Sequence, residues 1–393
     1  MRLGIYIDAM YLVEEDGTVL TNFETLPFLR FGSEVGRHFD ELVLFGRAAP
    51  EGVGVDYALP SGARVAPLPW YPSLAHLGDF LRAVTRIVPA LWRGLDRVDV
   101  VWAFGPHPIS LVLAFLALVR RRRVVLGVRQ DTMPYFRTRL RGRGTAPLLA
   151  PLWVLDALWR AVSRAVPAAV VGPELERRYR GPRPGLLPMT VSLMREEDIA
   201  ADVRPAPGEQ VELLTVGRVE PEKNPLLLVD ALADLIAEGD RRWRLTWIGT
   251  GRLTDAVRER ARERGIADAV DLLGFVPPGE GLLARYRAAD VFVHVALTEG
   301  VPQVLLEALA TATPVVATDV GGVSFALDGG RAGALVPPRD RQALVEAVRA
   351  VVADDEARTT RTRRGLELAR ERTLEAESRR VAAFLRAGST ALR

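Results

Sequence analysis

Short apolar runs rich in β-branched residues alternate with longer amphipathic segments along nearly the whole chain. This alternation is typical of repeated β–α–β units, in which helices cover a sheet of parallel strands. In the first part of the chain it predicts strands at 2–7, 41–45, 99–103, 124–128 and 168–171. It also predicts helices near 25–38, 74–94, 107–121, 146–165 and 173–180. We therefore expect one α/β domain there.

The second part repeats the pattern after an expected linker from Pro188 to Gly208, a segment with little periodicity. Strands are predicted near 211–216, 244–248, 270–273, 291–295, 314–318 and 333–336. Helices are predicted near 224–238, 253–264, 280–289, 302–312 and 340–353, with a further helical pattern at 354–387. We expect two doubly wound parallel-sheet α/β domains, at 1–190 and 208–372, with a C-terminal helix at 373–393 completing the first.

The composition is that of a folded protein. The chain has 393 residues, 49% of them hydrophobic, and no cysteine, which excludes disulfides, a thiolate nucleophile and a cysteine-ligated metal. Its longest nearly uninterrupted apolar run, Ile109–Val119, is well short of the roughly 18 residues that span a bilayer. The first ten residues lack the pattern of a signal peptide, so we expect a cytoplasmic protein.

Positive charge is concentrated in the first half. Residues 1–190 contain 24 Arg and 17 acidic residues, for a net charge of +7, whereas the remainder has a net charge of −4. This imbalance indicates an anionic partner for the first half. Only one of the 52 basic residues is a lysine, Lys223. A coding bias towards arginine explains the total, and the retained lysine then marks a position that needs a compact ammonium group.

The first candidate site is the segment Gly217–Asn224, which follows a predicted strand and precedes a helix. Arg218 and Lys223 can place two cations beside the N-terminus of that helix, where backbone amides also attract an anion. The alternative interpretation is a surface loop in which both cations pair with Glu220 and Glu222. The loop alone favours the alternative, but the single lysine favours a site.

The second candidate site lies within residues 298–310. Pro302 suits the first turn of a helix, which places Glu299 in the loop and Glu307 on the helix. Amides at the start of the helix can bind an anion, and two carboxylates can accept hydrogen bonds from ligand hydroxyls. In the alternative interpretation, Glu299 only complements the helix dipole and Glu307 is an exposed helix residue. The segment by itself leaves both open.

Taken together, these motifs resemble the retaining glycosyltransferases of family 4, also described as glycosyl transferases group 1. The motifs are Gly217-Arg218-x4-Lys223, Glu299-x7-Glu307 and the turn Thr318–Gly322. The resemblance is close over 211–353, including Gly249-Thr250-Gly251 and Gly274-Phe275-Val276, and only general in the first half. It implies the GT-B fold, in which two Rossmann-like domains face a central cleft.

The resemblance also implies roles for individual residues. The donor would be a nucleotide sugar, either a UDP- or a GDP-sugar, with Arg218 and Lys223 on its diphosphate, Glu307 on the ribose and Glu299 on the sugar. Backbone near Phe275 and Val276 would line the base pocket. The other donor-binding positions that it implies are Gly217, Gly249, Gly251, Gly300, Val301 and Pro302. Transfer would proceed with retention, by front-face displacement in which the leaving phosphate accepts the acceptor's proton.

Physical chemistry agrees with a reaction that needs no metal or cofactor. Cations and a helix N-terminus lower the barrier where negative charge appears on a leaving phosphate. The chain has no Asp-x-Asp motif to present a divalent ion. Glu299 and Glu307 share one loop–helix segment and are poorly placed to flank a glycosidic bond, as the carboxylates of a hydrolase do. Gly249-Thr250-Gly251 lacks the third glycine of a dinucleotide fingerprint.

The first half departs from the family pattern. Asp8-Ala9-Met10 stands where many members have a glycine-rich loop, and Arg129-Gln130-Asp131 stands where many have a histidine followed by an aspartate. Arg129, Gln130, Asp131 and His107 are our candidates for the acceptor side of the cleft. A helix cap is the alternative for His107. His294 lies in a buried strand pattern and is interpreted as a core residue.

Two basic segments of the first half could contact an anionic membrane. Arg120–Arg123 follow the apolar run 109–119, which we interpret as a helix covering the sheet. In 137–160, four arginines precede leucines and tryptophans, and this pattern fits a helix at a lipid surface as well as a buried helix. Nucleic acid is not expected as a partner, because interleaved aromatic residues and a binding module are missing.

We therefore expect a glycosyltransferase that acts on a lipid-linked or other cell-envelope glycan, in the cytoplasm or at the inner face of the membrane. Two alternatives stay open. One is a GT-B epimerase or phosphorylase that uses the same phosphate site. The other is a non-catalytic partner subunit, which the altered first half suggests.

Overall fold

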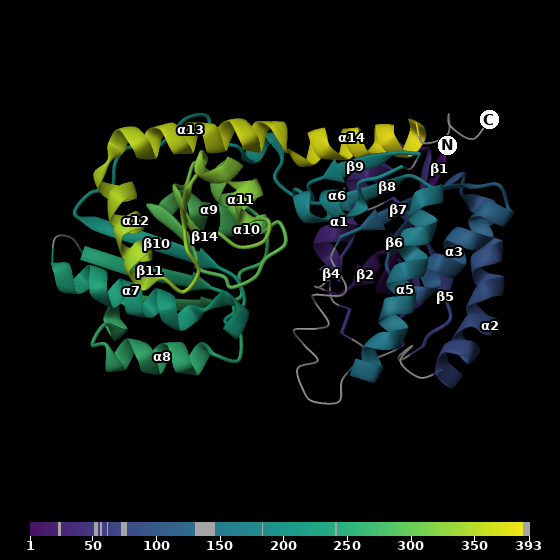
Figure 1. Ribbon diagram of the computed structural model, residues 1–393, viewed down its shortest axis with the longest axis horizontal. Coiled ribbons are helices and arrows are strands. Elements are labelled where there is room, and N and C mark those ends of the chain that lie inside the picture. The colour runs from purple at the N-terminus through teal and green to yellow at the C-terminus, as the bar shows by residue number, and fades with distance from the viewer. Residues whose placement is uncertain are drawn as a thin grey trace. The chain divides into compact units, whose positions relative to one another are not determined.

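The computed structural model describes residues 1–22, 25–50, 54–55, 57–60, 62–71, 77–129, 146–182, 184–239 and 242–387 (Figure 1). The chain divides into two compact units. Unit 1 comprises Met1–Leu193 with Leu374–Arg393, and unit 2 comprises Met194–Thr373. Each unit contains a largely parallel sheet covered by helices, which confirms the predicted α/β class.

The sheet of unit 1 has nine strands. Seven are parallel, in the order β5 (Ala63–Leu68), β3 (Glu41–Ala48), β1 (Arg2–Val13), β6 (Val100–Gly105), β7 (Arg123–Val128), β8 (Ala168–Val171) and β9 (Leu186–Met189). The short strands β2 (Val19–Thr21) and β4 (Tyr57–Ala58) add an antiparallel extension to the end of β1. The chain builds outwards from β1 first in one direction and then, from β6, in the other. The order of the strands therefore reverses between β1 and β6.

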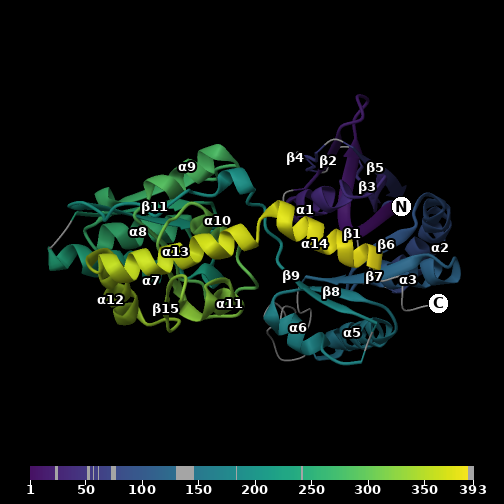
Figure 2. The same cartoon turned by 90° about the horizontal axis from the view of Figure 1, so that it is seen from above.

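Helices cover both faces of this sheet (Figure 2). One face carries α1 (Leu26–Gly36) and α14 (Leu374–Ala387), which pack against each other. The other carries α2 (Leu77–Gly94), α3 (Pro108–Val119), α5 (Ala146–Ala165) and α6 (Pro173–Tyr179). Successive side chains of β1 point to opposite faces of the sheet. Ile5 and Ile7 therefore enter the core beneath α1 and α14, and Tyr6 enters the core on the other face.

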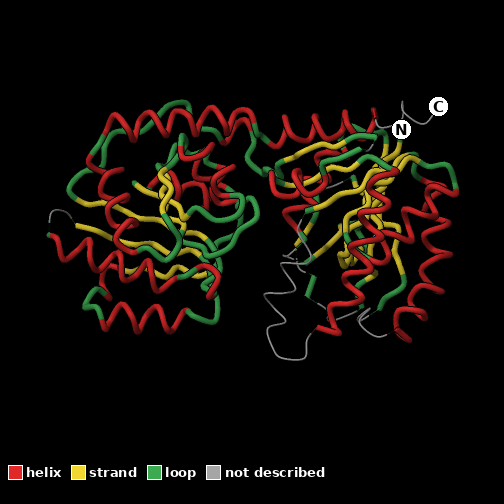
Figure 3. The backbone as a smooth tube through the Cα atoms, viewed as in Figure 1, coloured by secondary structure: helices red, strands yellow, loops and turns green. Residues whose placement is uncertain are grey.

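The sheet of unit 2 has six parallel strands (Figure 3). Their order is β12 (Val270–Gly274), β11 (Arg242–Ile248), β10 (Gln210–Val216), β13 (Val291–His294), β14 (Val315–Thr318) and β15 (Ala334–Val336). The order reverses between β10 and β13. In open α/β sheets, ligands bind beyond the carboxyl ends of the strands at such a reversal.

Two helical layers enclose the sheet of unit 2. On one face lie α7 (Pro225–Glu238), α8 (Thr254–Glu263) and α12 (Arg341–Ala353). On the other lie α9 (Glu280–Ala288), α10 (Gln303–Ala310), α11 (Val323–Ala326) and α13 (Asp355–Glu371). No helix in the described part of the chain is both long enough and apolar enough to cross a membrane.

All eleven predicted strands are present, but four strands of unit 1 were missed, namely β2, β4, β5 and β9. Two of these contain a proline, Pro67 in β5 and Pro188 in β9, and both strands lie at an edge of the sheet. Proline is tolerated at an edge, where it need not donate to a neighbour. The other two are very short, so their periodicity is too weak to detect. Met189 belongs to β9, so the start of the predicted linker was placed too early.

Candidate functional site

Two loops of unit 2 meet at the point where its strand order reverses. Residues 217–224 follow β10, and residues 295–302 follow the neighbouring strand β13. The backbone N–H of Leu297 donates to the carbonyl oxygen of Glu222 at 2.7 Å, which ties the loops together. Glu222 lies in the short 3₁₀ helix η3 (Pro221–Lys223), so this contact fixes Lys223 beside the second loop.

Two side chains converge on one oxygen atom of a third between these loops. Lys223 Nζ donates to Glu299 Oε1, and His294 Nε2 lies 3.0 Å from the same atom. The side chains of Lys223, Glu299 and His294 are 21%, 13% and 3% exposed. We call these residues the Lys–Glu–His cluster. It brings together two predicted site residues and one, His294, that was interpreted only as part of the core.

The surroundings of Glu299 keep its carboxyl group ionised. Burial alone would raise the pKa of Glu299, but the close contact with His294 and the charge of Lys223 outweigh it and hold the pKa below its ordinary value. An ionised carboxylate accepts hydrogen bonds only. Both observed partners meet Oε1, so Oε2 is the oxygen suited to accept a hydrogen bond from a ligand hydroxyl.

Glu307, the second predicted carboxylate, has a different environment. It lies on α10 and accepts a hydrogen bond from the hydroxyl of buried Tyr286 at Oε2, at 2.7 Å. Burial raises the pKa of Glu307, and the Tyr286 hydrogen bond opposes this only in part. The interpretation of Glu307 as a fully exposed helix residue is therefore wrong. Tyr286 is a partner that the sequence analysis did not identify.

Glycines pack the loops of this edge against one another. Gly249 has φ = +135°, and a Cβ atom there would overlap the carbonyl oxygen of Gly217. A Cβ atom at Gly251 would likewise overlap the carbonyl oxygen of Val219. These close approaches place the loop after β11 on the loop that carries Lys223.

The loop that carries Glu299 is supported in the same way from the opposite side. Gly321 has φ = +53°, and a Cβ atom there would overlap the carbonyl oxygen of Glu299. The N–H of Gly322 donates to the carbonyl oxygen of Gly300 at 2.9 Å. Next to Gly300, Val301 packs against the core, and Pro302 is buried at the N-cap of α10. The turn Thr318–Gly322 therefore packs against the loop that carries Glu299 and supports its backbone.

Arg218 stands apart from the Lys–Glu–His cluster. Its guanidinium group donates to Glu222 at 2.8 Å, and its side chain is 66% exposed. The pairing expected of a surface loop is thus present for Arg218, whereas Lys223 pairs with Glu299 and with neither Glu220 nor Glu222. Glu220 pairs instead with Arg252, at 2.9 Å.

The predicted base-pocket residues follow β12. Gly274 accepts a hydrogen bond from the N–H of Gly249 at 2.7 Å, which joins this loop to the loop after β11. The Phe275 side chain is exposed, whereas Val276 packs against the core of unit 2. An exposed aromatic ring beside a backbone turn is a suitable surface for a planar base.

A second polar cluster lies at the carboxyl edge of the sheet in unit 1, where its strand order reverses. Arg47 Nε lies 3.2 Å from Asp8 Oδ1, and the hydroxyl of Tyr71 donates to the same oxygen at 2.9 Å. His107 Nε2 lies 3.6 Å from Asp8 Oδ2. The Tyr6 hydroxyl and His107 Nδ1 are 3.0 Å apart. We call these five residues the Asp8 cluster.

His107 is the only member of this cluster that the sequence analysis selected. It occupies the N-cap position of α3, but its side chain makes no cap hydrogen bond, so the helix-cap alternative is wrong. Burial lowers the pKa of His107, with Arg47 acting in the same sense and Asp8 opposing it. At neutral pH the imidazole is therefore neutral. The signal that was missed is Asp8, a carboxylate inside an otherwise apolar strand.

Of the remaining candidates in unit 1, Arg129 is described and does not belong to this cluster. Arg129 lies over the ring of Phe28, with its guanidinium carbon 5.8 Å from the ring centre. Gln130 and Asp131 lie outside the described residues. Within the described part of the chain, no three histidine, aspartate or glutamate side chains are grouped as metal ligands would be.

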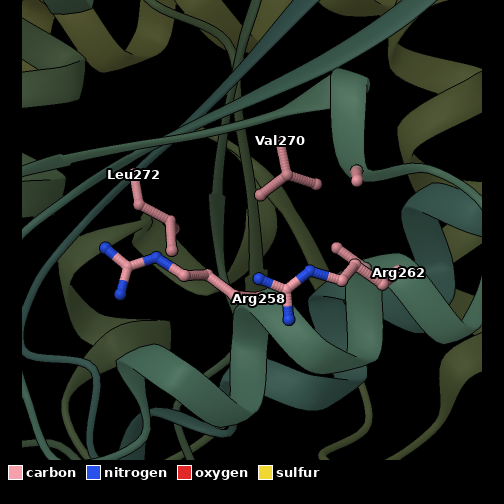
Figure 4. Close-up of a pocket in the computed structure, with 6 residues that line it drawn as sticks. Arg258, Arg262, Val270 and Leu272 are labelled. Atoms are coloured by element: carbon pink, nitrogen blue, oxygen red, sulfur yellow. The ribbon is translucent and has the colours of Figure 1, made fainter.

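A pocket of about 220 Å³ in unit 2 contains none of the candidate residues (Figure 4). It lies between α8 and the start of β12, and it is lined by Arg258, Ala261, Arg262, Ala267, Val270 and Leu272. Its two arginines pair with Asp255 and Glu259 on their own helix. The pocket is thus separate from the carboxyl edge of the sheet.

Similar solved structures establish the fold of the whole chain. Sucrose-phosphate synthase of Thermosynechococcus elongatus has a TM-score of 0.67 at 18% identity and covers 98% of both chains. The HepE protein of Anabaena, solved with UDP, has a TM-score of 0.69 at 17% identity, over 98% of this chain and 100% of that one. The chain has the GT-B fold, which confirms the predicted architecture.

Sequence comparisons identify the domain that carries the Lys–Glu–His cluster. Residues 210–354 match the family described as glycosyl transferases group 1, so this part of the chain is a domain of that family. The D-inositol 3-phosphate glycosyltransferase of Geodermatophilus obscurus is 39% identical over 163 residues, or 40% of this chain and 36% of that protein. The relative of the same name in Nocardia farcinica is 38% identical over 160 residues. The aligned residues thus span only about a third of either relative.

Proposed function

We propose that the protein is a retaining glycosyltransferase of family 4, which transfers a sugar from a UDP- or GDP-sugar to an acceptor hydroxyl. The observation that carries the proposal is the convergence of Lys223 and His294 on Glu299, at the strand reversal of a glycosyl transferases group 1 domain. HepE, a protein of the same fold, was solved with UDP and with UDP-glucose, which supports a nucleotide-sugar donor.

In this proposal, unit 2 binds the donor through the loops described above. Lys223 and Arg218 contact the diphosphate, Glu307 accepts hydrogen bonds from the ribose, and Glu299 accepts them from the donor sugar. The loop at Phe275 and Val276 receives the base. Gly217, Gly249, Gly251 and Gly300 let the backbone approach the diphosphate closely, since bulkier residues would hold it away, and Val301 and Pro302 shape the same loop at the start of α10.

The donor must displace internal partners before it is held in this way. Lys223 exchanges Glu299 for a phosphate oxygen, and Arg218 leaves Glu222. When Lys223 moves, His294 Nε2 still lies beside Glu299 Oε1, and Oε2 meets the sugar. Binding therefore replaces a lysine–carboxylate pair with a lysine–phosphate pair, and the hydroxyls of the donor sugar then solvate the Glu299 carboxylate.

The transfer step needs no protein nucleophile. The acceptor oxygen bonds to the anomeric carbon as the bond from that carbon to the phosphate oxygen breaks, and the departing phosphate takes the acceptor's proton. Negative charge grows on the leaving diphosphate, where Lys223, Arg218 and the amides at the start of α10 stabilise it. The configuration is retained because attack and departure occur on the same face of the sugar.

Unit 1 is proposed to bind the acceptor, with His107 and Asp8 facing its hydroxyls and Arg129, Gln130 and Asp131 as further candidates. A lipid-linked or other cell-envelope glycan fits the basic character of this half, and the proposed location is the cytoplasm or the inner face of the membrane. The relatives are named for D-inositol 3-phosphate, but we do not propose that acceptor for this chain. The family match lies wholly within unit 2, whereas the acceptor is proposed to bind unit 1.

The proposal is tested first with a panel of nucleotide diphosphates and then with their sugars. Calorimetric titration should find one nucleotide that binds the wild type, with affinity reduced about tenfold in Lys223→Ala and in Glu307→Ala. Unchanged affinity in both variants would remove the site assignment. NMR of the transfer product reports whether the anomeric configuration is retained.

Two other classes are separated by the same assay. An epimerase would convert the donor sugar without acceptor, and a phosphorylase, given a glycan and inorganic phosphate, would move a glycosyl group from the glycan to the phosphate and release a sugar phosphate. A non-catalytic subunit would bind a nucleotide without transferring or hydrolysing any sugar.

A further inference from the structure

Exposed apolar side chains are concentrated on three helices of unit 1. In the described residues, eleven large apolar side chains are exposed, and seven of them lie on α2, α3 and α5. The seven are Trp92 on α2, Phe115, Leu118 and Val119 on α3, and Trp153, Val154 and Leu158 on α5. Singly exposed apolar residues are ordinary, but a contiguous group marks an interaction surface.

The three helices form one layer, so these side chains share one surface. α2 packs against α3, and both views of the molecule show α5 on the other side of α3 (Figures 1 and 2). The inner side of each helix enters the same core through Leu91, Leu113 and Trp159. The exposed residues therefore point away from the sheet, and we call this surface the outer face.

α3 is apolar on both of its sides. Its twelve residues, Pro108–Val119, include no charged side chain, and Phe115 is 66% exposed. A helix that is apolar all round is normally covered on all sides. Here the sheet covers the inner side, and no described residue covers Phe115 on the outer side.

The charge around the outer face indicates what covers it. Residues 83–97, 108–122 and 151–165 contain eight arginines and only two acidic residues. Of these two, Asp156 is buried and Asp96 pairs with Arg120, whose guanidinium lies 4.6 Å from the ring centre of Trp92. A second copy docked through the same face would bring arginines against arginines. A partner that complements the outer face therefore has a negatively charged surface, which pairs with the arginines, and an apolar layer under that surface, which receives the apolar side chains.

The end of α5 adds a cationic pocket to this face. A pocket of about 160 Å³ is lined by Arg160, Arg164, Arg178 and Arg180, together with Ser163, Tyr179, Gly181 and Pro182. Asp156 and Glu176 balance part of this charge. Arg160 and Arg164 follow Trp153 at helical spacings of seven and eleven residues, so they continue the side of α5 that Trp153 occupies. This side of α5 is therefore apolar at Trp153 and cationic at Arg160 and Arg164. The same order of apolar and charged groups is found in a lipid, whose acyl chains lie beneath a phosphate headgroup.

We propose that the outer face docks on a membrane surface that contains anionic lipids. Trp92, Phe115, Leu118, Trp153 and Leu158 enter the interfacial layer, and the surrounding arginines contact headgroup phosphates. This locates the membrane contact that the proposed acceptor class suggests. It involves no residue of the Lys–Glu–His cluster, so vesicle binding and nucleotide binding can fail independently.

The full chain should sediment with vesicles of phosphatidylcholine and phosphatidylglycerol in equal amounts, and not with phosphatidylcholine alone. The double variant Phe115→Ser, Leu118→Ser should lower this partitioning about tenfold, since it removes inserted apolar area. Arg93→Glu and Arg121→Glu should each lower it at least about fivefold. Brominated lipid should quench tryptophan fluorescence, and less so in Trp153→Phe. Circular dichroism checks that each variant is folded.

Matched controls are Val13→Ser and Arg37→Glu, which change exposed residues outside the outer face and should leave partitioning unchanged. The proposal is overturned if no variant-sensitive binding occurs at low salt, or if the controls lose binding equally. It is also overturned if only the arginine variants have an effect, if heparin binds as tightly as the vesicles, or if Phe115→Ser abolishes a dimer in sedimentation equilibrium without affecting vesicle binding.

Discussion

Each unit carries a charged cluster where the strand order of its sheet reverses, but the two clusters are built differently. In unit 2, Lys223 and Glu299 belong to two short loops, and only His294 lies in a strand. In unit 1, Asp8 and Arg47 lie inside strands, and Tyr71 and His107 come from two further segments. One cluster therefore depends on two continuous segments, and the other on five side chains from four segments, since only Tyr6 and Asp8 share a strand.

The difference explains why only one cluster is recognisable from sequence. The segments 217–223 and 299–307 keep fixed spacings, and they lie inside the family match at 210–354. Side chains that come from four segments far apart in the chain leave no single spacing to recognise. The ion pairs differ too, since Lys223 offers one ammonium that can exchange partners, whereas Arg47 faces Asp8 with both Nε and a terminal nitrogen. Unit 2 holds an exchangeable pair and unit 1 a rigid one.

Lys223→Ala should have the largest effect and would test whether the exchangeable pair is the functional one. Removing a cation aimed at the leaving phosphate should lower kcat roughly 10²–10³-fold. Arg218→Ala should cost only about threefold, because its guanidinium is exposed and already paired with Glu222. Steady-state transfer assays with the donor from the nucleotide panel measure both.

Arg258→Ala, which changes an exposed arginine on α8, is the matched control and should retain full activity. Equal losses in Lys223→Ala and Arg258→Ala would contradict the distinction between the cluster and ordinary surface charge.

Asp8→Asn should disturb unit 1 and leave the donor side intact. The pKa of His107 should fall further, because Asp8 is the group that raises it. Stability should drop by about 1–2 kcal/mol, since Arg47 loses its partner while Asp8 is itself 34% exposed. NMR titration of the histidines and urea unfolding measure these effects. Binding of UDP or GDP should not change, and Asp16→Asn is the control at an exposed aspartate of the same unit.

His294→Asn should separate positioning of the sugar from binding of the nucleotide. Because His294 contacts Glu299, kcat should fall about tenfold, whereas affinity for the free nucleotide diphosphate should stay within about twofold. His294→Gln, whose amide can reach Glu299, should restore part of the activity. A uniform loss of nucleotide affinity in both variants would show that His294 acts only through stability.

The two carboxylates of unit 2 should affect stability in opposite directions with pH. The lowered pKa of Glu299 means that its ionised form stabilises the folded state, and this contribution is lost as pH falls below about 4.3. The raised pKa of Glu307 means that its protonated form is favoured on folding, so stability falls as pH rises from about 4.3 through that pKa. Urea unfolding measures the free energy of unfolding of Glu299→Gln and Glu307→Gln across this pH range. Relative to the wild type, the two substitutions should change the slope of that free energy against pH in opposite directions. Changes of the same sign would refute the assignment.

Sequence patterns predicted the fold more completely in unit 2 than in unit 1. Every strand of the smaller sheet was predicted, because buried parallel strands are apolar throughout and well separated by helices. In unit 1, Pro67 and Pro188 concealed two edge strands. The prediction for the apolar run at 109–119 was correct in part. Its helix covers the sheet as expected, but Phe115, on the side of the helix that faces away from the sheet, is exposed.

The sequence by itself determined the α/β class, the domain that matches a known family and the positions of most residues proposed for the donor side, because periodicity and loop spacing are properties of neighbouring positions. Only the tertiary structure decided which side chains meet. Lys223 could have paired with Glu220 or Glu222 but pairs with Glu299, which His294 also contacts, and Asp8 gathers partners from distant segments. These choices depend on distances between loops and strands across a sheet, and the order of residues along the chain does not contain them.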